Sequence, residues 1–446
     1  MLPRTENRAA AGHRARARIA RRLLPYLFVL YIISYLDRVN LSYAALQMTK
    51  DLNLSDRVFG IGAGIFFVGY FVLEIPGTIL VETWSARGWI ARIMITWGIL
   101  AAGMGLVHTP NQFYWVRFFL GAAEAGFFPG LLIYLSHWFC YEDRAKAVAL
   151  FMAALPVSSI LGAPASGVIL TRAHWLGIAG WRWLFFIEGA PAIVFGVITV
   201  LYLTDWPRQA RWLPEDERDW IESQLKAENE TKELVSQAGI HTSIWVNIWG
   251  GLRNINVILL ALTYFFIITG FYGVNFWLPT ILKRLSGLPD LMVTTISALP
   301  YLVGLVAMLL VGWSSDKSGE RRWHAAAPML IASLGLFGIA LTQGSGTGIV
   351  AGIFCLAAVG LYGFFPAFWS LPGRFLSGTA AAASVGLINS VGNLGGYLGP
   401  FMVGRLAGKN GSFVGGMAFL SICALVGACL VLMVRNHDSE PALPGH

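Results

Sequence analysis

Four charged residues stand inside apolar stretches of the N-terminal half of the chain: Asp37, Arg38, Arg117 and Glu124. Arg117 and Glu124 are seven positions apart, which puts them on one face of a helix, roughly 10 Å apart along its axis. That separation is too long for a direct ion pair, so we expect each of them to have partners on another helix. Such residues form either a substrate or proton path or a buried structural ion network. Two acids and two arginines carry no net charge, which limits the cost of burying them together.

The composition excludes a soluble globular protein. Of the 446 residues, 56% are hydrophobic and 13% are charged, and the mean hydropathy is +0.63, values typical of a polytopic membrane protein. Most of the net charge of +8 lies in segments that flank apolar runs, so it does not indicate nucleic acid as a partner. The cysteines and histidines lack metal-ligand spacing, and no nucleophile, phosphate loop or metal motif occurs. The sequence therefore predicts no metal, no cofactor and no enzyme.

Apolar runs of span length predict twelve transmembrane helices, because these runs are about twice as long as the strands of a membrane barrel. Most of the 32 Lys and Arg residues fall on the same side as the Arg-rich N-terminus, which places both termini in the cytoplasm. The predicted spans are 23–44, 58–80, 90–108, 113–136, 146–170, 182–204, 255–281, 291–313, 325–343, 348–370, 379–403 and 413–434.

Two short motifs recur in almost the same register and indicate two six-helix halves. Gly-Phe-Phe-Pro occurs at 126–129 and at 363–366, and Ala-Pro at 163–164 has Gly-Pro at 399–400 as its counterpart. The prediction is an all-α membrane protein. Its expected parts are a cytoplasmic tail (1–22), a bundle (23–204), a cytoplasmic linker with a short surface helix at 214–225 (205–254), a second bundle (255–434) and a second cytoplasmic tail (435–446).

Repeated halves place a substrate between them near the bilayer midplane, so polar residues deep in the spans are site candidates. Tyr35 lies three residues before Arg38, and Tyr70 lies within the second span with Glu74 one turn later. A buried tyrosine hydroxyl needs a partner, which a substrate carboxylate would supply. The alternative for either tyrosine is ordinary packing.

The second half offers neutral polar groups in place of charges. The candidates are Asn275 in the seventh span, Trp369 near the end of the tenth, and Asn389 and Asn393 one turn apart in the eleventh. For the asparagines the alternative is hydrogen bonding between packed helices. Glu188 lies less than two turns from the outer end of the sixth span, and we interpret it as an interfacial structural residue.

Gly312-Trp-Ser-Ser-Asp-Lys-Ser-Gly-Glu-Arg-Arg322 resembles a loop signature of the major facilitator superfamily. The equivalent stretch after the second span, Gly77 to Arg87, is a degraded copy in which Glu82 stands near the acidic position. The stretches 35–40, 89–98 and 117–129 together resemble the anion:cation symporter branch of that superfamily.

This resemblance covers essentially the whole chain and implies a major facilitator fold in the bacterial inner membrane. Similar bacterial members take up tartrate, phthalate, sugar acids or related carboxylates with protons, so a small organic anion and protons are the implied partners of a monomer. By this resemblance, Arg38 would hold the substrate carboxylate with Tyr35, Tyr70 and Asn389 near it, and Asp37 and Glu124 would carry protons. From their positions in the spans, we expect Asn275, Trp369 and Asn393 to complete the site and Arg117 to hold the charge network together.

Two other classes of function remain as alternatives. An exporter or antiporter of cationic or lipophilic compounds could use the same fold, although two buried arginines would repel cations. A membrane enzyme would need a catalytic constellation, which the sequence lacks.

Overall fold

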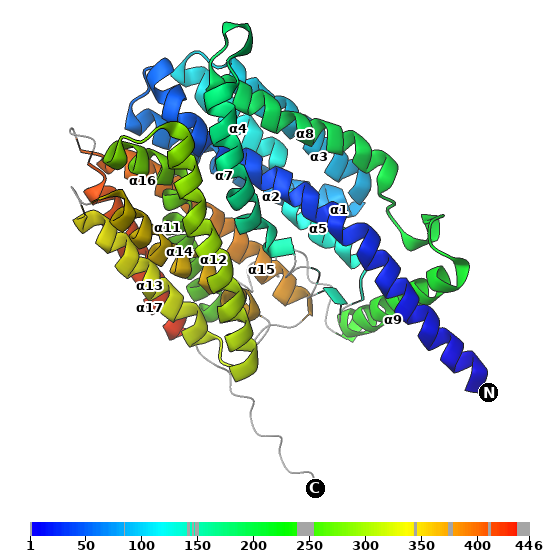
Figure 1. Ribbon diagram of the computed structural model, residues 1–446. Coiled ribbons are helices and arrows are strands. Elements are labelled where there is room, and N and C mark those ends of the chain that lie inside the picture. The colour runs from blue at the N-terminus through cyan, green and yellow to red at the C-terminus, as the bar shows by residue number, and fades with distance from the viewer. Residues whose placement is uncertain are drawn as a thin grey trace. The chain divides into compact units, whose positions relative to one another are not determined.

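The computed structural model describes residues 2–83, 85–140, 143–144, 147, 151–238, 254–342, 346–372, 378–408 and 412–434. Every regular element within these ranges is a helix (Figure 1), which confirms the predicted all-α fold. The predicted C-terminal tail (435–446), the later part of the predicted linker (239–253) and most of residues 141–150 lie outside the described residues.

The chain divides into two units. Unit 1 comprises Met1–Val235, Leu278–Lys283 and Gly287–Ala298, and unit 2 comprises Ser236–Trp277, Arg284–Ser286 and Leu299–His446. In unit 1, α3 packs against α8, α2 against α4, and α1 against both α7 and α8. In unit 2, α13 packs against α14 and α17. The helices of the first part of the chain are α1 (Leu2–Asp51), α2 (Asp56–Thr83), α3 (Ala86–Gly103), η1 (Met104–Leu106), α4 (Pro110–Glu124), α5 (Phe127–Ser136), α7 (Ala154–Arg172), η2 (Trp175–Gly177), α8 (Gly180–Tyr202), η3 (Pro207–Gln209) and α9 (Glu215–Ala238).

The remaining helices belong to unit 2, except that α11 and α12 contribute residues to both units. Within the described residues, eleven helical stretches are long and apolar enough to cross a membrane, and one of them, Pro110–Ser136, comprises α4 and α5 together. The predicted run 379–403 is not among them, because it is divided into two helices of 16 and 12 residues. The helices of the second part of the chain are α11 (Ile255–Ser286), α12 (Asp290–Ser318), α13 (Arg322–Leu341), α14 (Thr347–Ser370), α15 (Gly378–Asn393), α16 (Gly395–Leu406) and α17 (Val414–Met433).

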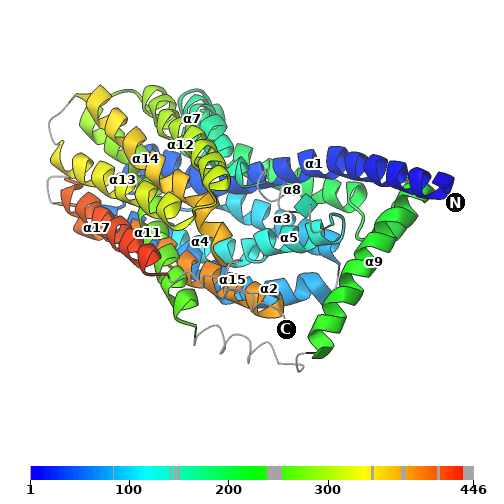
Figure 2. The same ribbon diagram turned by 90° about the horizontal axis from the view of Figure 1, so that it is seen from below.

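The segment predicted as a cytoplasmic tail, 1–22, is helical from Leu2 and continuous with the first span. Its N-terminal turns extend beyond the other helices of unit 1 and meet α9, which crosses them at a steep angle (Figure 2). The predicted surface helix at 214–225 is present as the first half of α9, which continues to Ala238.

The predicted span 113–136 is two helices, not one. Thr109 accepts a hydrogen bond from the backbone N–H of Gln112 and Pro110 follows it, so the N-terminus of α4 is capped. The helix ends at Glu124, and Gly126 adopts a left-handed backbone with φ of +82° before α5 begins. Residues with a side chain rarely adopt this backbone, so a glycine permits the break. The membrane span is confirmed as Pro110–Ser136, but its helix is interrupted and not continuous as expected, and the break lies directly beside Glu124.

Small residues let α4 approach α2 closely. A side chain at Gly121 would place its Cβ 1.9 Å from the carbonyl oxygen of Phe66, and one at Gly69 would be 2.1 Å from that of Phe118. Helix packing in membranes depends on such contacts. The two helices that carry Tyr70, Arg117 and Glu124 are therefore held at a fixed distance.

Candidate functional site

Arg38 and Glu124 meet inside unit 1. A guanidinium nitrogen of Arg38 on α1 donates to Oε1 of Glu124 at the end of α4, and the two form an ion pair. The Oγ atom of Ser34, one turn earlier on α1, donates to the same carboxylate oxygen at 2.9 Å. The side chain of Glu124 is 2% exposed and that of Arg38 is 14% exposed. The partner that the sequence required for Glu124 thus lies on the first helix.

Aromatic rings cover the other side of Arg38. Its guanidinium carbon lies 5.3 Å from the ring centre of Phe66 and 5.5 Å from that of Tyr70, both on α2. Cations are attracted to such ring faces. The structure therefore brings Tyr70 to Arg38 as expected, and it adds Phe66, which no sequence pattern distinguished from ordinary packing.

Asp37 has different neighbours from those of Arg38. Its carboxylate accepts a hydrogen bond from Nε1 of Trp97 on α3 at 2.6 Å and one from the side chain of Asn40 at 3.4 Å. Adjacent residues of an α-helix point about 100° apart. Asp37 is therefore directed to α3, while Arg38 is directed to α2 and α4.

Arg117 is buried between α4 and α2. It donates to the backbone carbonyls of Gly62 and Ala63 at 3.2 and 3.3 Å, and its guanidinium carbon lies 4.8 Å from the ring centre of Phe66. A helix carbonyl has a second lone pair that can accept such a bond. Phe66 therefore lies against both arginines. The predicted role of Arg117 as the residue that holds this network together stays a prediction.

The other predicted residue of unit 1, Tyr35, is 1% exposed on α1. The remaining four candidates belong to unit 2. Asn275 on α11 donates to the carbonyl of Phe271 at 2.7 Å and accepts from the hydroxyl of Tyr362 at 3.3 Å. These bonds are those of an asparagine between packed helices.

Trp369, Asn389 and Asn393 are each half-buried in unit 2. The ring of Trp369 meets that of Tyr264 edge to face, with ring centres 5.0 Å apart. Asn393 is the last residue of α15, directly before the division from α16. The predicted roles of these three residues in substrate binding stay predictions.

Sequence reasoning assigned Glu188 to the interface, and the structure places its carboxylate inside unit 1. Oε1 accepts a hydrogen bond from Ser166 at 2.8 Å, and Oε2 is buried with no hydrogen-bond partner among the described residues. Asn40 and Asp37 lie close enough to interact with this carboxylate. Its position eight residues into α8 was the signal that could have identified it.

The described residues contain no group of three or more His, Cys, Asp or Glu that could hold a metal ion. What unit 1 does contain is an arginine paired with an acid, a second acid on the adjacent residue, and aromatic rings around them. This arrangement can bind a carboxylate and exchange protons. An ionised acid neutralises a neighbouring arginine, and an acid that takes up a proton leaves the charge of that arginine free to attract an anion.

The model of the Major Facilitator Superfamily matches residues 27–400. The chain belongs to the major facilitator superfamily. It is a multi-pass transporter of the bacterial inner membrane and not an enzyme.

The two relatives named here are similar to the chain along nearly their whole length. The chain is 45% identical to a protein of Agrobacterium vitis named "Putative tartrate transporter", over 95% of both chains. It is 36% identical to a "Quinolone resistance transporter" of Acinetobacter baumannii, over 93% of both chains. Among solved structures, it is similar to a bacterial homolog of the human lysosomal transporter Spinster, with a TM-score of 0.72 and 18% identity over 94% of this chain and 95% of that one. That likeness concerns the fold alone.

Proposed function

We propose that this transporter takes up a small organic anion together with protons by alternating access. The substrate is a carboxylate, such as tartrate, a sugar acid or an aromatic acid. The observation that carries the proposal is the buried ion pair between Arg38 and Glu124, with Tyr70 beside it.

Glu124 controls whether Arg38 can bind an anion. While Glu124 is ionised, its carboxylate occupies the guanidinium and neutralises it. When Glu124 takes up a proton, the positive charge of Arg38 is no longer offset, and a substrate carboxylate can bind the planar guanidinium through two parallel hydrogen bonds. The bound carboxylate in turn favours the protonated form of Glu124, so proton and substrate binding are linked reciprocally.

Asp37 is proposed as the second proton carrier. Its carboxylate is bonded to Trp97 and lies one residue from Arg38. Asn40 contacts Asp37 and also Glu188, so these three residues form a second polar group beside Arg38. Interacting acids titrate as a set, so the transported protons are assigned to the group of acids and not to one residue.

The other candidates position or complete the site. Arg117 holds α4 against α2 and so fixes where Glu124 meets Arg38. Tyr35, Asn275, Trp369, Asn389 and Asn393 are proposed to supply hydrogen bonds and an aromatic surface to the substrate. Both termini are proposed to lie in the cytoplasm, and the protein is proposed to act as a monomer.

The names of the relatives support two readings. The "Putative tartrate transporter" at 45% identity supports a carboxylate substrate. The quinolone resistance transporter at 36% identity supports the alternative, an exporter or antiporter on the same fold. Buried arginines favour an anionic substrate in either case.

Uptake by proteoliposomes tests the proposal. Vesicles that contain the purified protein are given labelled tartrate, or another acid from a panel of carboxylates, with and without an inward proton gradient. We expect accumulation only with the gradient, and none after a protonophore is added or in vesicles without protein. An exporter driven by antiport would instead lose preloaded substrate faster under the same gradient, which would exclude symport.

A further inference from the structure

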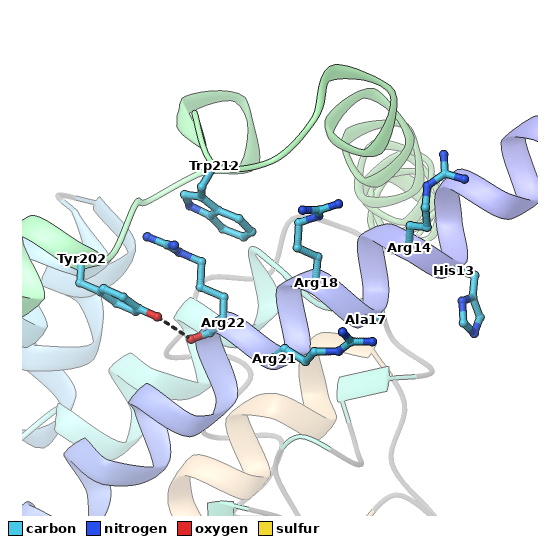
Figure 3. Close-up of a pocket in the computed structure, with 8 residues that line it drawn as sticks. All are labelled: His13, Arg14, Ala17, Arg18, Arg21, Arg22, Tyr202 and Trp212. Atoms are coloured by element: carbon cyan, nitrogen blue, oxygen red, sulfur yellow. Dashed lines mark hydrogen bonds between the residues drawn. The ribbon is translucent and has the colours of Figure 1, made fainter.

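A basic pocket lies at the N-terminal end of unit 1, away from the Arg38 site. It has a volume of about 580 Å³ and is lined by Arg14, Arg18, Arg21, Arg22, Tyr202 and Trp212, with His13 and Ala17 at its edge (Figure 3). The four arginines follow one another at the spacing of a single helix face. They lie on α1 directly before its predicted membrane crossing at residue 23.

Two of these arginines are neutralised by α9. Arg14 donates to Asp216 at 2.7 Å, and Arg18 donates to both carboxylate oxygens of Glu217 at 2.8 and 3.2 Å. The hydrogen bond from Arg14 lowers the pKa of Asp216 below its usual value, so this acid stays ionised. Arg21 is exposed and forms no ion pair with any residue that the structure describes. The pocket therefore keeps positive charge after α9 has docked.

Arg22 has a buried hydrogen-bond donor, its Nε atom, without an acceptor in the described part of the chain. Its guanidinium lies between the rings of Tyr202 and Trp212, at 4.5 and 4.8 Å from their centres (Figure 3). The Nε atom of Arg22 and the Nε1 atom of Trp212 are both buried and have no hydrogen-bond partner within the described part of the chain. A buried donor without an acceptor is unfavourable. Two such donors beside a stacked guanidinium match the oxygens of a phosphate.

We propose that the basic pocket binds the phosphate of an anionic phospholipid headgroup. A free phosphate ion would offer the same oxygens, but the surroundings favour a lipid. The residues directly before Tyr202 on α8 are apolar and turned outward: Leu201 is 83% exposed and Val200 is 44% exposed. Acyl chains can cover this apolar surface while the headgroup enters the pocket. Basic residues at the end of a membrane helix are attracted to anionic leaflets in the same way.

Binding of a lipid here would fasten α9 to the membrane surface through α1. The same face of α1 contacts α9 through Arg14 and Arg18 and would contact the lipid through Arg21 and Arg22. Trp212 lies three residues before the start of α9. The lipid would therefore stabilise the packing of α9 on α1 without touching the substrate site.

Native mass spectrometry of the purified protein in detergent tests this proposal. The protein is titrated with phosphatidylglycerol, with phosphatidylcholine and with inorganic phosphate. We expect phosphatidylglycerol to bind more tightly than phosphatidylcholine, and inorganic phosphate to fail to displace it at equal concentration. Arg22→Gln should weaken phosphatidylglycerol binding about tenfold, and exposed Arg21→Gln several-fold.

Arg208→Gln is the matched control. Arg208 is exposed on η3, directly after α8, lies outside the pocket, and loses the same charge. It should change binding by less than about twofold. Equal losses in Arg21→Gln and Arg208→Gln would show a general effect of charge and overturn the proposal. Displacement of the lipid by equal inorganic phosphate would overturn the lipid as the ligand. Melting temperatures in lipid-free detergent show whether Arg22→Gln is folded. If Arg22→Gln is not folded, lipid binding by Arg21→Gln tests the proposal in its place.

Discussion

Arg38 and Glu124 form an ion pair whose two members have unequal exposure. Glu124 is almost fully buried and is also bonded to Ser34, whereas part of the Arg38 side chain remains open. The ionised form of buried Glu124 is stabilised by Arg38, because a buried charge without a partner is unfavourable. The side chain of Arg38 is the more exposed of the two, and under the proposed function it would bind a substrate carboxylate in place of Glu124.

Arg38→Lys tests the guanidinium as the substrate anchor. Lysine keeps the charge but offers a compact ammonium instead of a planar pair of donors. We expect uptake to fall at least about tenfold while the melting temperature stays close to that of the wild type. Arg57→Lys, at an exposed position on α2, is the control and should transport normally. Near-normal uptake by Arg38→Lys would remove Arg38 from this role.

Arg117→Ala tests whether Arg117 holds the network together. The variant loses two hydrogen bonds to α2 carbonyls and the contact with Phe66. Each hydrogen bond to a charged group contributes about 1.5–3 kcal/mol, so we expect a lower melting temperature and lower expression. The exposed Arg57→Ala serves as the comparison. A stable Arg117→Ala protein with only a weaker substrate affinity would instead indicate direct contact with the substrate.

At the scale of the helix, the break between α4 and α5 sets the position of Glu124. Gly126→Ala puts a side chain on a left-handed backbone, and its Cβ would lie 3.2 Å from the backbone of Gly77. The conformation alone costs about 1–2 kcal/mol. We expect a lower melting temperature and reduced transport, because the end of α4 must shift.

Gly103→Ala is the control for this change. Gly103 has φ of −58°, and a Cβ there would meet nothing within 4 Å. Its melting temperature and transport should remain those of the wild type. If Gly126→Ala behaves in the same way, the break does not depend on glycine and needs another cause.

Sequence patterns predicted the existence of the helices better than their interruptions. Eleven helical stretches of the described chain, with α4 and α5 counted as one, are long and apolar enough to span a membrane. Such stretches could be predicted because hydropathy over a whole span is a strong signal. The interruption after Glu124 depends on the backbone of Ala125 and Gly126, whereas the one at Leu394 occurs although that residue keeps a helical backbone. The recurring Gly-Phe-Phe-Pro motif shows the difficulty. It begins a new helix at Gly126, yet at Gly363 it lies inside the continuous α14.

At the scale of the whole molecule, four buried charged residues could be identified from the sequence, whereas the buried position of Glu188 and the partners Ser34 and Trp97 could not. Asp37, Arg38, Arg117 and Glu124 were identified because charges inside apolar spans are rare. The partners Ser34 and Trp97 could not be found in this way, since serine and tryptophan are common in membrane helices. Which charges pair depends on how α1, α3 and α4 pack, and no local pattern contains that information.

The fold joins these partners from distant parts of the chain. Arg38 and Glu124 are separated by 86 residues, and Asp37 and Trp97 by 60. Each pair links α1 to a different helix of unit 1. A change in the packing of these helices would therefore alter the surroundings of both acids together.

Glu124→Gln gives the most direct test of proton coupling. Glutamine resembles the protonated acid and cannot release a proton, so the variant should still bind substrate. In proteoliposomes we expect counterflow exchange of labelled substrate at close to the wild-type rate and no accumulation under an inward proton gradient. Accumulation of substrate by Glu124→Gln in response to that gradient would contradict the account, because Glu124 would then not be the residue that couples protons to transport.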